Sequence, residues 1–292
     1  MSSELKNINI CSLNNEVNGS CVPKNILIDI KKNIIPKSNA KHKEEIIESL
    51  ANKTKCDSGN LKEKELCILK KIGDEKNIVK YFKPETKSFS HNYWLNNTEI
   101  DNIQYQLQNL FKGYYYSNIH MIDLGMFPPS NVDLLENKDD IYPIKEIDFI
   151  NELNEGGIRL SYNDKLSKYG LVVNTDSSQG SGLHWFSIFI DFESMPITIE
   201  YFNSSGYNIR NPKFSKFFRE LADEISLKYK KCIFKKVTDI QHQRDDTSNC
   251  GSYALYYLWK RLNGTPSEFF AENKVTDEHM ALFRKYLFRL KK

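Results

Sequence analysis

The pattern of hydrophobic and polar positions changes near residue 88. Before it, apolar residues recur at helical spacing in two short stretches, residues 41–51 and 61–71, which we predict to be amphipathic helices. Aromatic residues there are confined to Tyr81 and Phe82. Residues 83–88 have the composition of a linker. We therefore predict an amino-terminal helical arm over residues 1–88 and a larger domain over residues 89–292.

The larger domain alternates between helical and strand patterns. A helix is predicted to begin near Trp94-Leu95-Asn96, and another at Pro212 with Asn211 as its cap. Further helices are predicted from Cys250 and from Asp277, which follows the capping residue Thr276. Aromatic and β-branched residues predict strands at 169–173, 184–191, 197–203 and 232–240. These elements indicate an α+β domain with a mainly antiparallel sheet.

Charge adds little to this interpretation. The net charge is +3, and the first 90 residues hold 17 lysines against 12 acidic residues. Arginine, which recognises phosphate and guanine in bidentate fashion, does not occur before Arg159. We interpret the lysine-rich arm as a solvated helical surface, with an electrostatic tether to acidic partners as the less favoured alternative. Nucleic-acid binding is not expected.

The cysteines indicate neither a metal site nor a secreted protein. They show no CxxC pair and no zinc spacing, so we expect no metal and no cofactor. We also expect no signal peptide and no membrane-spanning segment. A reducing, cytosol-like compartment is the resulting prediction. The six cysteines are Cys11, Cys21, Cys56, Cys67, Cys232 and Cys250.

The strongest chemical signal is Cys250-Gly251 at the head of the apolar run 252–259. At a helix start, unpaired backbone N–H groups and the helix dipole favour a thiolate, and the same groups can bind an oxyanion. His184 and Asn203 end a predicted hairpin upstream. If its turn centres on Glu193-Ser194, His184 lies directly opposite Asn203, whose amide oxygen can fix the imidazole tautomer. Cys250, His184 and Asn203 thus form a candidate catalytic triad.

A second oxyanion donor is expected from the loop before Cys250. Gln243 is our candidate and Gln241 its rival, because spacing alone does not separate them. We interpret His242 as surface-exposed and Asp245-Asp246 as solvating the loop. Each feature alone has a structural explanation, such as a buried small residue at Cys250 or a turn at Asn203. Their combination, in this order on strand, strand end, loop and helix start, favours catalysis.

These residues resemble the adenovirus-protease and SUMO-protease superfamily of cysteine peptidases. The resemblance rests on Gly182-Leu183-His184-Trp185, Ile199 to Ser204, His242-Gln243-Arg244 and Cys250-Gly251. It covers most of residues 170–290. It is strongest for the polyprotein-processing proteases of the African swine fever virus type. It implies a papain-like α+β core, a Cys250, His184 and Asn203 triad, and Gln243 at the oxyanion hole. Asn203 departs from the Asp that is common in the superfamily.

The resemblance also implies a substrate. In SUMO proteases two tryptophans form a narrow tunnel that admits only Gly-Gly, and Trp94 and Trp185 occupy matching places here. Ordinary core packing is the alternative for each. We therefore expect a viral endopeptidase that cuts structural polyproteins at Gly-Gly-X sites, in host cytoplasm and in virions. The alternatives are a deconjugating peptidase for ubiquitin-like proteins, an acyltransferase, and a catalytically inactive scaffold.

Overall fold

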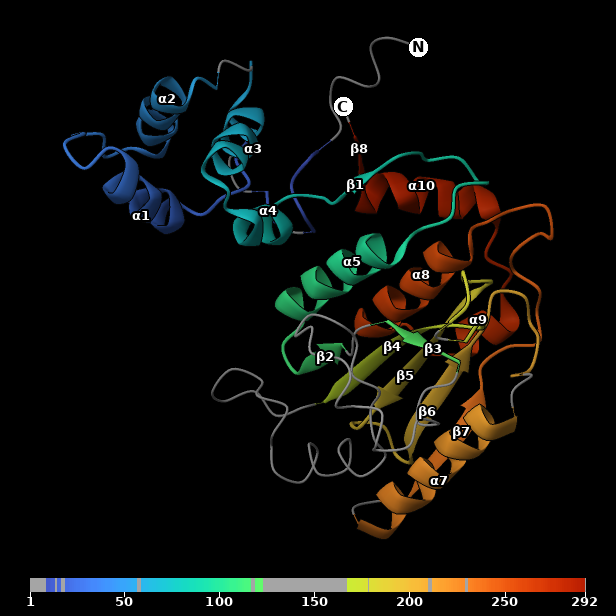
Figure 1. Cartoon of the computed structure of the whole chain (residues 1–292). Helices are drawn as coiled ribbons and strands as arrows, with labels where there is room; N and C mark the ends of the chain where they lie inside the picture. Colours follow the sequence, from blue (N-terminus) through green and yellow to red (C-terminus); the bar gives the residue numbers. More distant parts are fainter. Residues whose placement is uncertain are drawn as a thin grey trace. The chain divides into compact units, whose positions relative to one another are not determined.

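The computed structural model describes residues 9–13, 15–16, 19–56, 59–116, 119–122, 167–177, 179–209, 212–228 and 231–291. The chain divides into two compact units (Figure 1). One comprises Met1–Lys87 together with Lys285–Lys292, and the other comprises Ser88–Arg284. Asn211, predicted as a helix cap, lies outside the described residues. No helix in the described ranges is both long and apolar enough to cross a membrane.

The amino-terminal unit is built from short helices around a core of its own. Both helices predicted from periodicity are present, as α2 and α3. Asn60 caps the start of α3 by accepting from the Glu63 N–H, and Gly73 ends it with a φ of 71°. The buried core includes Leu27, Ile46, Leu50 and Ile68. The helices are α1 (Lys24–Ile34), α2 (Lys43–Thr54), α3 (Leu61–Ile72) and α4 (Glu75–Tyr81).

Two disulfides stabilise this unit. Cys11 is bonded to Cys21, and Cys56 is bonded to Cys67. Sequence spacing did not reveal these pairs, because each is brought together by the fold and not by a short motif. Free thiols are Cys232 and Cys250. Since disulfides persist in oxidising surroundings, the prediction of a reducing compartment from cysteine usage is not supported.

The carboxyl-terminal residues belong to the same unit as the arm. Strand β8 (Arg289–Leu290) pairs in parallel with β1 (Glu85–Thr86), so part of the predicted linker is a strand. The Arg289 guanidinium also donates to the Glu85 carboxylate over 2.6 Å. The chain end is therefore held to residues that directly follow the arm helices.

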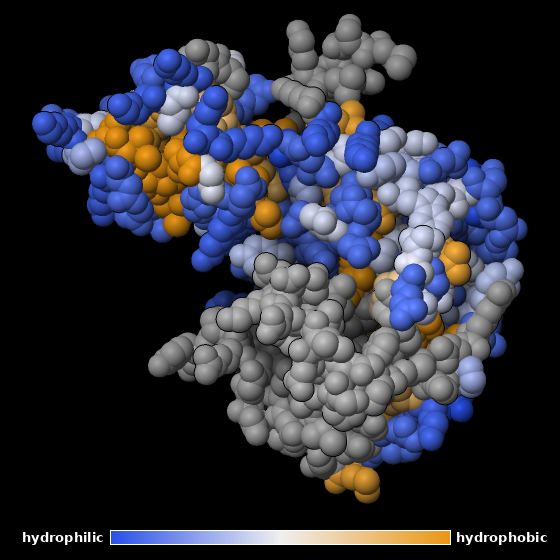
Figure 2. Space-filling model, in the orientation of Figure 1, coloured by the Kyte–Doolittle hydropathy of each residue, from blue (hydrophilic) through white to orange (hydrophobic). Residues whose placement is uncertain are grey.

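The surface of the arm is largely solvated and partly self-neutralised. In Figure 2 its visible face is mostly hydrophilic, with an apolar patch between the helices. Lys64 pairs with Glu48 over 2.6 Å, and Lys62 pairs with Glu16 over 2.5 Å. These ion pairs neutralise part of the lysine charge within the arm itself.

The larger unit is organised around a mixed sheet in the order β2-β4-β5-β6-β7, with β3 also paired to β4. The central pairs β4–β5 and β5–β6 are antiparallel, as predicted, whereas β2, β3 and β7 join the sheet in parallel. The fold class is thus confirmed as α+β, and β7 ends four residues earlier than predicted. The strands are β2 (Tyr114–Tyr116), β3 (His120–Met121), β4 (Lys168–Asn174), β5 (Trp185–Asp191), β6 (Ile197–Phe202) and β7 (Cys232–Lys236).

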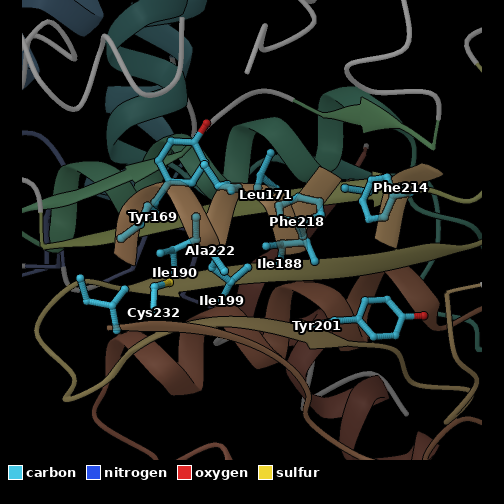
Figure 3. Close-up of a cluster of buried hydrophobic side chains, with 14 of the residues drawn as sticks. Tyr169, Leu171, Ile188, Ile190, Ile199, Tyr201, Phe214, Phe218, Ala222 and Cys232 are labelled. Atoms are coloured by element: carbon cyan, nitrogen blue, oxygen red, sulfur yellow. The ribbon is translucent and has the colours of Figure 1, made fainter. Parts of the chain in front are cut away.

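Helices cover both faces of this sheet (Figure 1). Helix α7 (Pro212–Lys228) packs Phe214 and Phe218 on one face, against Leu171, Ile188 and neighbouring residues (Figure 3). Helix α8 (Cys250–Leu262) lies on the opposite face, where Tyr257 stacks on Phe202 with ring centroids 4.4 Å apart. Burial on both faces explains why β5 is an almost unbroken apolar run. The remaining helices are α5 (Asn97–Leu110), α9 (Glu268–Glu272) and α10 (Asp277–Leu287).

The hairpin register differs from the predicted one. Ser187 pairs with Phe202 and Asp191 with Thr198, so the reversal centres on Ser194-Met195. The Ser194 hydroxyl stabilises this turn, lying 2.9 Å from the Asp191 carbonyl oxygen. Continuing the ladder places Asn203 opposite Phe186 instead of His184. Because a two-residue change keeps side chains on the same face, Asn203 and His184 remain diagonal neighbours.

His242 is fully buried, contrary to the prediction of surface exposure. Its ring lies beside Phe202, and its Nδ1 accepts the Val275 N–H over 3.1 Å. Burial lowers the pKa of His242 from 6.5 to about 4, so it is neutral in the folded protein at neutral pH. The polar composition of the surrounding loop concealed this inward-facing position.

A buried ion pair fixes the carboxyl-terminal half of α8 to the sheet. Arg261 Nε donates to Glu200 Oε2 over 2.7 Å, and Tyr257 donates to the same oxygen over 2.6 Å. Glu200 is 1% exposed, so its charge depends on these partners. Lys235, at 3.7 Å, is a more distant cation.

Replacing Arg261 with Met is expected to lower the free energy of unfolding by about 3 kcal/mol, because Lys235 is then the one cation near Glu200 among the residues that the structure describes. Urea unfolding followed by tryptophan fluorescence measures this loss of stability. The signal reports on the larger unit, because all three tryptophans lie outside residues 1–88. The double variant Glu200→Leu/Arg261→Met is the control and should recover much of the loss. Equal losses in both variants would contradict the ion-pair interpretation.

Acid is expected to destabilise the larger unit through His242. The pKa is 6.5 for the free residue and about 4 in the fold, so the unfolded chain binds more protons between these values. Stability is therefore full above pH 6.5 and falls by about 3 kcal/mol as the pH drops toward 4. Unfolding titrations at several pH values measure this slope. In His242→Asn, which keeps an acceptor for Val275, the slope should be shallower, and an unchanged slope would contradict the assignment.

Candidate active site

Cys250 is the first residue of α8 and is 2% exposed. Gly251 lets this helix start pack closely, because a Cβ there would lie 3.2 Å from Leu95 Cβ and 3.3 Å from Trp185 Cδ1. Burial raises the pKa of the Cys250 thiol, while hydrogen bonds from the backbone N–H groups of Trp185 and Gly251 lower it. The backbone segment that carries His184 thus also contributes a hydrogen bond to Cys250.

His184 is the last residue of the connection between β4 and β5, residues 175–184. Asn174, 2% exposed, accepts the Leu183 N–H over 2.9 Å, and the Thr175 N–H donates to the His184 carbonyl over 2.8 Å. Gly182 adopts a φ of 91°, a conformation that favours glycine. The backbone on both sides of His184 is therefore fixed.

His184 Nε2 and Asn203 Oδ1 are 2.7 Å apart. Burial lowers the pKa of His184, and the hydrogen bond to Asn203 acts in the opposite direction. Asn203 itself lies one residue beyond β6, and Oδ1 also accepts the Ser205 N–H over 3.0 Å. The structure thus joins His184 directly to Asn203, and Trp185, the residue after His184, contributes its backbone N–H to Cys250.

Tyr201 determines which way the Asn203 amide points. Its hydroxyl donates to the Tyr207 carbonyl over 3.1 Å, which leaves its oxygen to accept from Asn203 Nδ2 over 2.8 Å. Asn203 Oδ1 must then face His184, so His184 Nε2 carries the proton and Nδ1 is the basic atom. In the sequence pattern, Tyr201 stands out only as a strand residue. Its position two residues before Asn203, on the same face of β6, is the signal that could have identified it.

The two candidate glutamines have different surroundings. Gln243 is buried, accepts from the Ser204 hydroxyl over 2.9 Å and donates its Nε2 to the Thr247 carbonyl over 2.7 Å. Gln241 is exposed and bonds to Asp245. Only Gln243 is thereby fixed next to the residue that follows Asn203.

The two tryptophans also differ. Trp185 is buried, and its Nε1–H donates to the Leu95 carbonyl over 3.2 Å. This environment also fits the alternative of ordinary core packing. Trp94, adjacent to Leu95, is 42% exposed, which packing does not explain. The bond from Trp185 to Leu95 brings the two tryptophan-containing segments together.

Asp277, at the start of α10, holds the loop that precedes the nucleophile. Its carboxylate accepts from the Arg244 N–H over 2.9 Å, the Thr247 hydroxyl over 2.9 Å and Asn249 Nδ2 over 2.6 Å. The sequence identified Asp277 only as the start of a helix, because nothing local shows that its side chain reaches residues 244–249. In the described part of the chain, no group of His, Cys, Asp and Glu side chains is arranged to hold a metal ion.

The chain is similar to known cysteine proteases. The family model described as "Ulp1 protease family, C-terminal catalytic domain" matches residues 93–292. The chain is 37% identical over 122 residues to the SUMO-1 cysteine protease of African swine fever virus, isolate Pig/Kenya/KEN-50/1950, and equally to the cysteine protease of isolate Tick/Malawi/Lil 20-1/1983. Each alignment covers 42% of this chain and 44% of the relative.

The crystal structure of the corresponding African swine fever virus protease is similar in fold. It superposes with a TM-score of 0.63 and 22% identity, over 98% of this chain and 97% of that one. Since the family model spans more than half of the chain, including His184, Asn203 and Cys250, the assignment does not depend on the shorter alignments. The chain belongs to the Ulp1 protease family.

Proposed function

We propose that the chain is a viral cysteine endopeptidase that processes structural polyproteins at Gly-Gly-X sites during virion maturation. The observation that carries this proposal is the 2.7 Å hydrogen bond between His184 and Asn203, formed beside a helix-start cysteine. An imidazole that is held in one tautomer, and a thiol with backbone donors around it, are the parts that acyl transfer requires. The relatives are named cysteine proteases of African swine fever virus, which supports a viral peptidase.

The proposed reaction proceeds in two stages. His184 accepts the Cys250 proton, and the thiolate attacks the carbonyl carbon of the scissile peptide bond. The Cys250 backbone N–H and the second N–H of Gln243 Nε2 bind the resulting oxyanion. Collapse breaks the C–N bond, and His184 returns the proton to the leaving amine. Water activated by His184 then hydrolyses the thioester and regenerates the thiol.

Gly-Gly selectivity would come from the two tryptophans. Trp185 is fixed by its bond to Leu95, and Trp94 presents an exposed ring next to that residue. Aromatic walls on both sides of the substrate would leave no room for a Cβ. The proposed partners are therefore polyproteins with Gly-Gly-X junctions, which the enzyme meets in the host cytoplasm or in assembling virions. The two disulfides of the arm are compatible with the virion.

A second candidate is a deconjugating peptidase for ubiquitin-like proteins. The name of one relative, SUMO-1 cysteine protease, favours it. Both candidates use the same triad and differ only in the substrate. Cleavage of Gly-Gly-X peptides without release of SUMO-1 from a conjugate would support the endopeptidase. Release of SUMO-1 with no cleavage of the free peptides would favour the deconjugase instead.

Cys250→Ala is expected to abolish cleavage of a Gly-Gly-X peptide, because the thioester forms on the Cys250 sulfur. Asn203→Ala should reduce kcat by about 10²–10⁴-fold, since His184 loses the acceptor that fixes its tautomer. Steady-state kinetics on a fluorogenic peptide measures both effects. Cys232→Ala, which removes the other free thiol, is the control and should retain activity. Full activity in Cys250→Ala would overturn the mechanism.

The glutamine assignment can be tested with a matched pair of variants. Gln243→Ala is expected to lower kcat by about 10²–10³-fold, because one of two oxyanion donors is lost. Gln241→Ala should leave kcat close to that of the wild type, since Gln241 is exposed and bonds only to Asp245 among the described residues. Thermal unfolding of both variants separates catalysis from loss of the Ser204 and Thr247 bonds. The reverse order of effects would assign the role to Gln241.

A further inference from the structure

Arg284 of α10 is buried deep in the larger unit. It is 1% exposed and ranks among the largest fully buried side chains of the described residues. Its Nη2 donates to the Ser248 carbonyl over 3.1 Å, whereas Nε and Nη1 have no hydrogen-bond partner among the described residues. A buried guanidinium with two unsatisfied nitrogens, which carry three N–H groups, is costly. The single bond to Ser248 does not offset this cost, so a further role of the Arg284 charge is expected.

The acidic residues around Arg284 are occupied by other donors. Glu99 accepts from the Tyr93 hydroxyl over 3.1 Å and from the Asn96 N–H over 2.8 Å. Asp277 is held by the loop before the nucleophile. Glu99, Asp277 and Tyr93 all interact with Arg284 electrostatically, and its guanidinium carbon lies 6.0 Å from the centre of the Tyr93 ring. These groups balance its charge in part without binding its free N–H groups.

Arg284 also acts on Cys250. Its partner Ser248 lies two residues before the nucleophile, and the guanidinium and the thiol interact electrostatically. Burial lowers the pKa of Arg284 to about 10, so it stays charged at neutral pH. The positive charge opposes the effect of burial on the Cys250 thiol. By contrast, burial and the Asn203 hydrogen bond govern the pKa of His184.

We propose that Arg284 is a positioning residue that stabilises the Cys250 thiolate as a fixed, buried cation, beyond the roles of His184 and the helix start. The proposal rests on the proposed cysteine peptidase function. A cation that is 1% exposed is not screened by salt as a surface charge would be. It favours the anionic nucleophile without touching the substrate or the reacting atoms. His184 then remains free to transfer the proton.

The test compares Arg284→Gln, Arg284→Met and Arg284→Lys with the wild type. Thiolate formation is titrated by ultraviolet absorbance, after subtraction of the Cys250→Ala signal, which also removes the contribution of Cys232. Arg284→Gln keeps a donor for Ser248 but no charge, Arg284→Lys keeps the charge, and Arg284→Met is an apolar chain that is expected to fold if the polar variant does not. Arg219→Gln on the surface of α7 is the matched control for net charge.

We expect Arg284→Gln and Arg284→Met, the neutral variants, to raise the Cys250 pKa by about one unit. At a pH below the pKa, this shift leaves about tenfold less thiolate. Arg284→Lys and Arg219→Gln should titrate like the wild type. If Cys250 has the same pKa in both neutral variants as in the wild type, the proposal is overturned. Equal shifts in Arg284→Lys and the neutral variants would also overturn it, because packing and not charge would then be responsible. The titration needs no turnover, so a chain that cleaves no peptide would refute the proposed function without deciding this inference.

Discussion

Burial of the Cys250 thiol is the constraint on which the rest of the site depends. A buried thiol prefers to be neutral, yet the nucleophile must be an anion. Three kinds of group around it oppose that preference. The Trp185 N–H bonds the sulfur, the helix start contributes its own N–H groups, and Arg284 contributes a positive charge. These contributions come from β5, α8 and α10, so the fold as a whole sets the reactivity of one side chain.

Helix α8 is held at both ends by charged residues from elsewhere in the chain. At its carboxyl end, Arg261 meets the buried Glu200 of β6. At its start, Asp277 fixes the preceding loop through three donors, and Arg284 holds the Ser248 carbonyl. Asp277 and Arg284 are seven residues apart and therefore lie on the same face of α10. One helix thus supplies both the anion and the cation that locate the nucleophile.

Periodicity and residue type predicted the α+β class and the central strands, because β4, β5 and β6 are apolar on both faces. They also predicted residues that the structure brings together, since His184 and Asn203 stand at the ends of one hairpin. The register was wrong by two residues, as turn geometry depends on side-chain bonds such as that of Ser194. Contacts between residues far apart in the chain could not be predicted either, because local sequence does not show which side chains meet. The burial of His242, the two disulfides and the reach of Asp277 follow from tertiary packing and not from local pattern.

The start of α8 lacks the features that usually stabilise a helix amino terminus. Its first turn holds no acidic residue, and the cap Asn249 makes no side-chain bond to the helix. Instead Asn249 Nδ2 donates to Asp277, and its Oδ1 has no partner in the described part of the chain. A conventional cap would occupy the N–H groups that an oxyanion needs, and an acidic residue would repel the thiolate. The helix therefore gives up local stability at its first turn and leaves these N–H groups for the anion that forms in the proposed reaction.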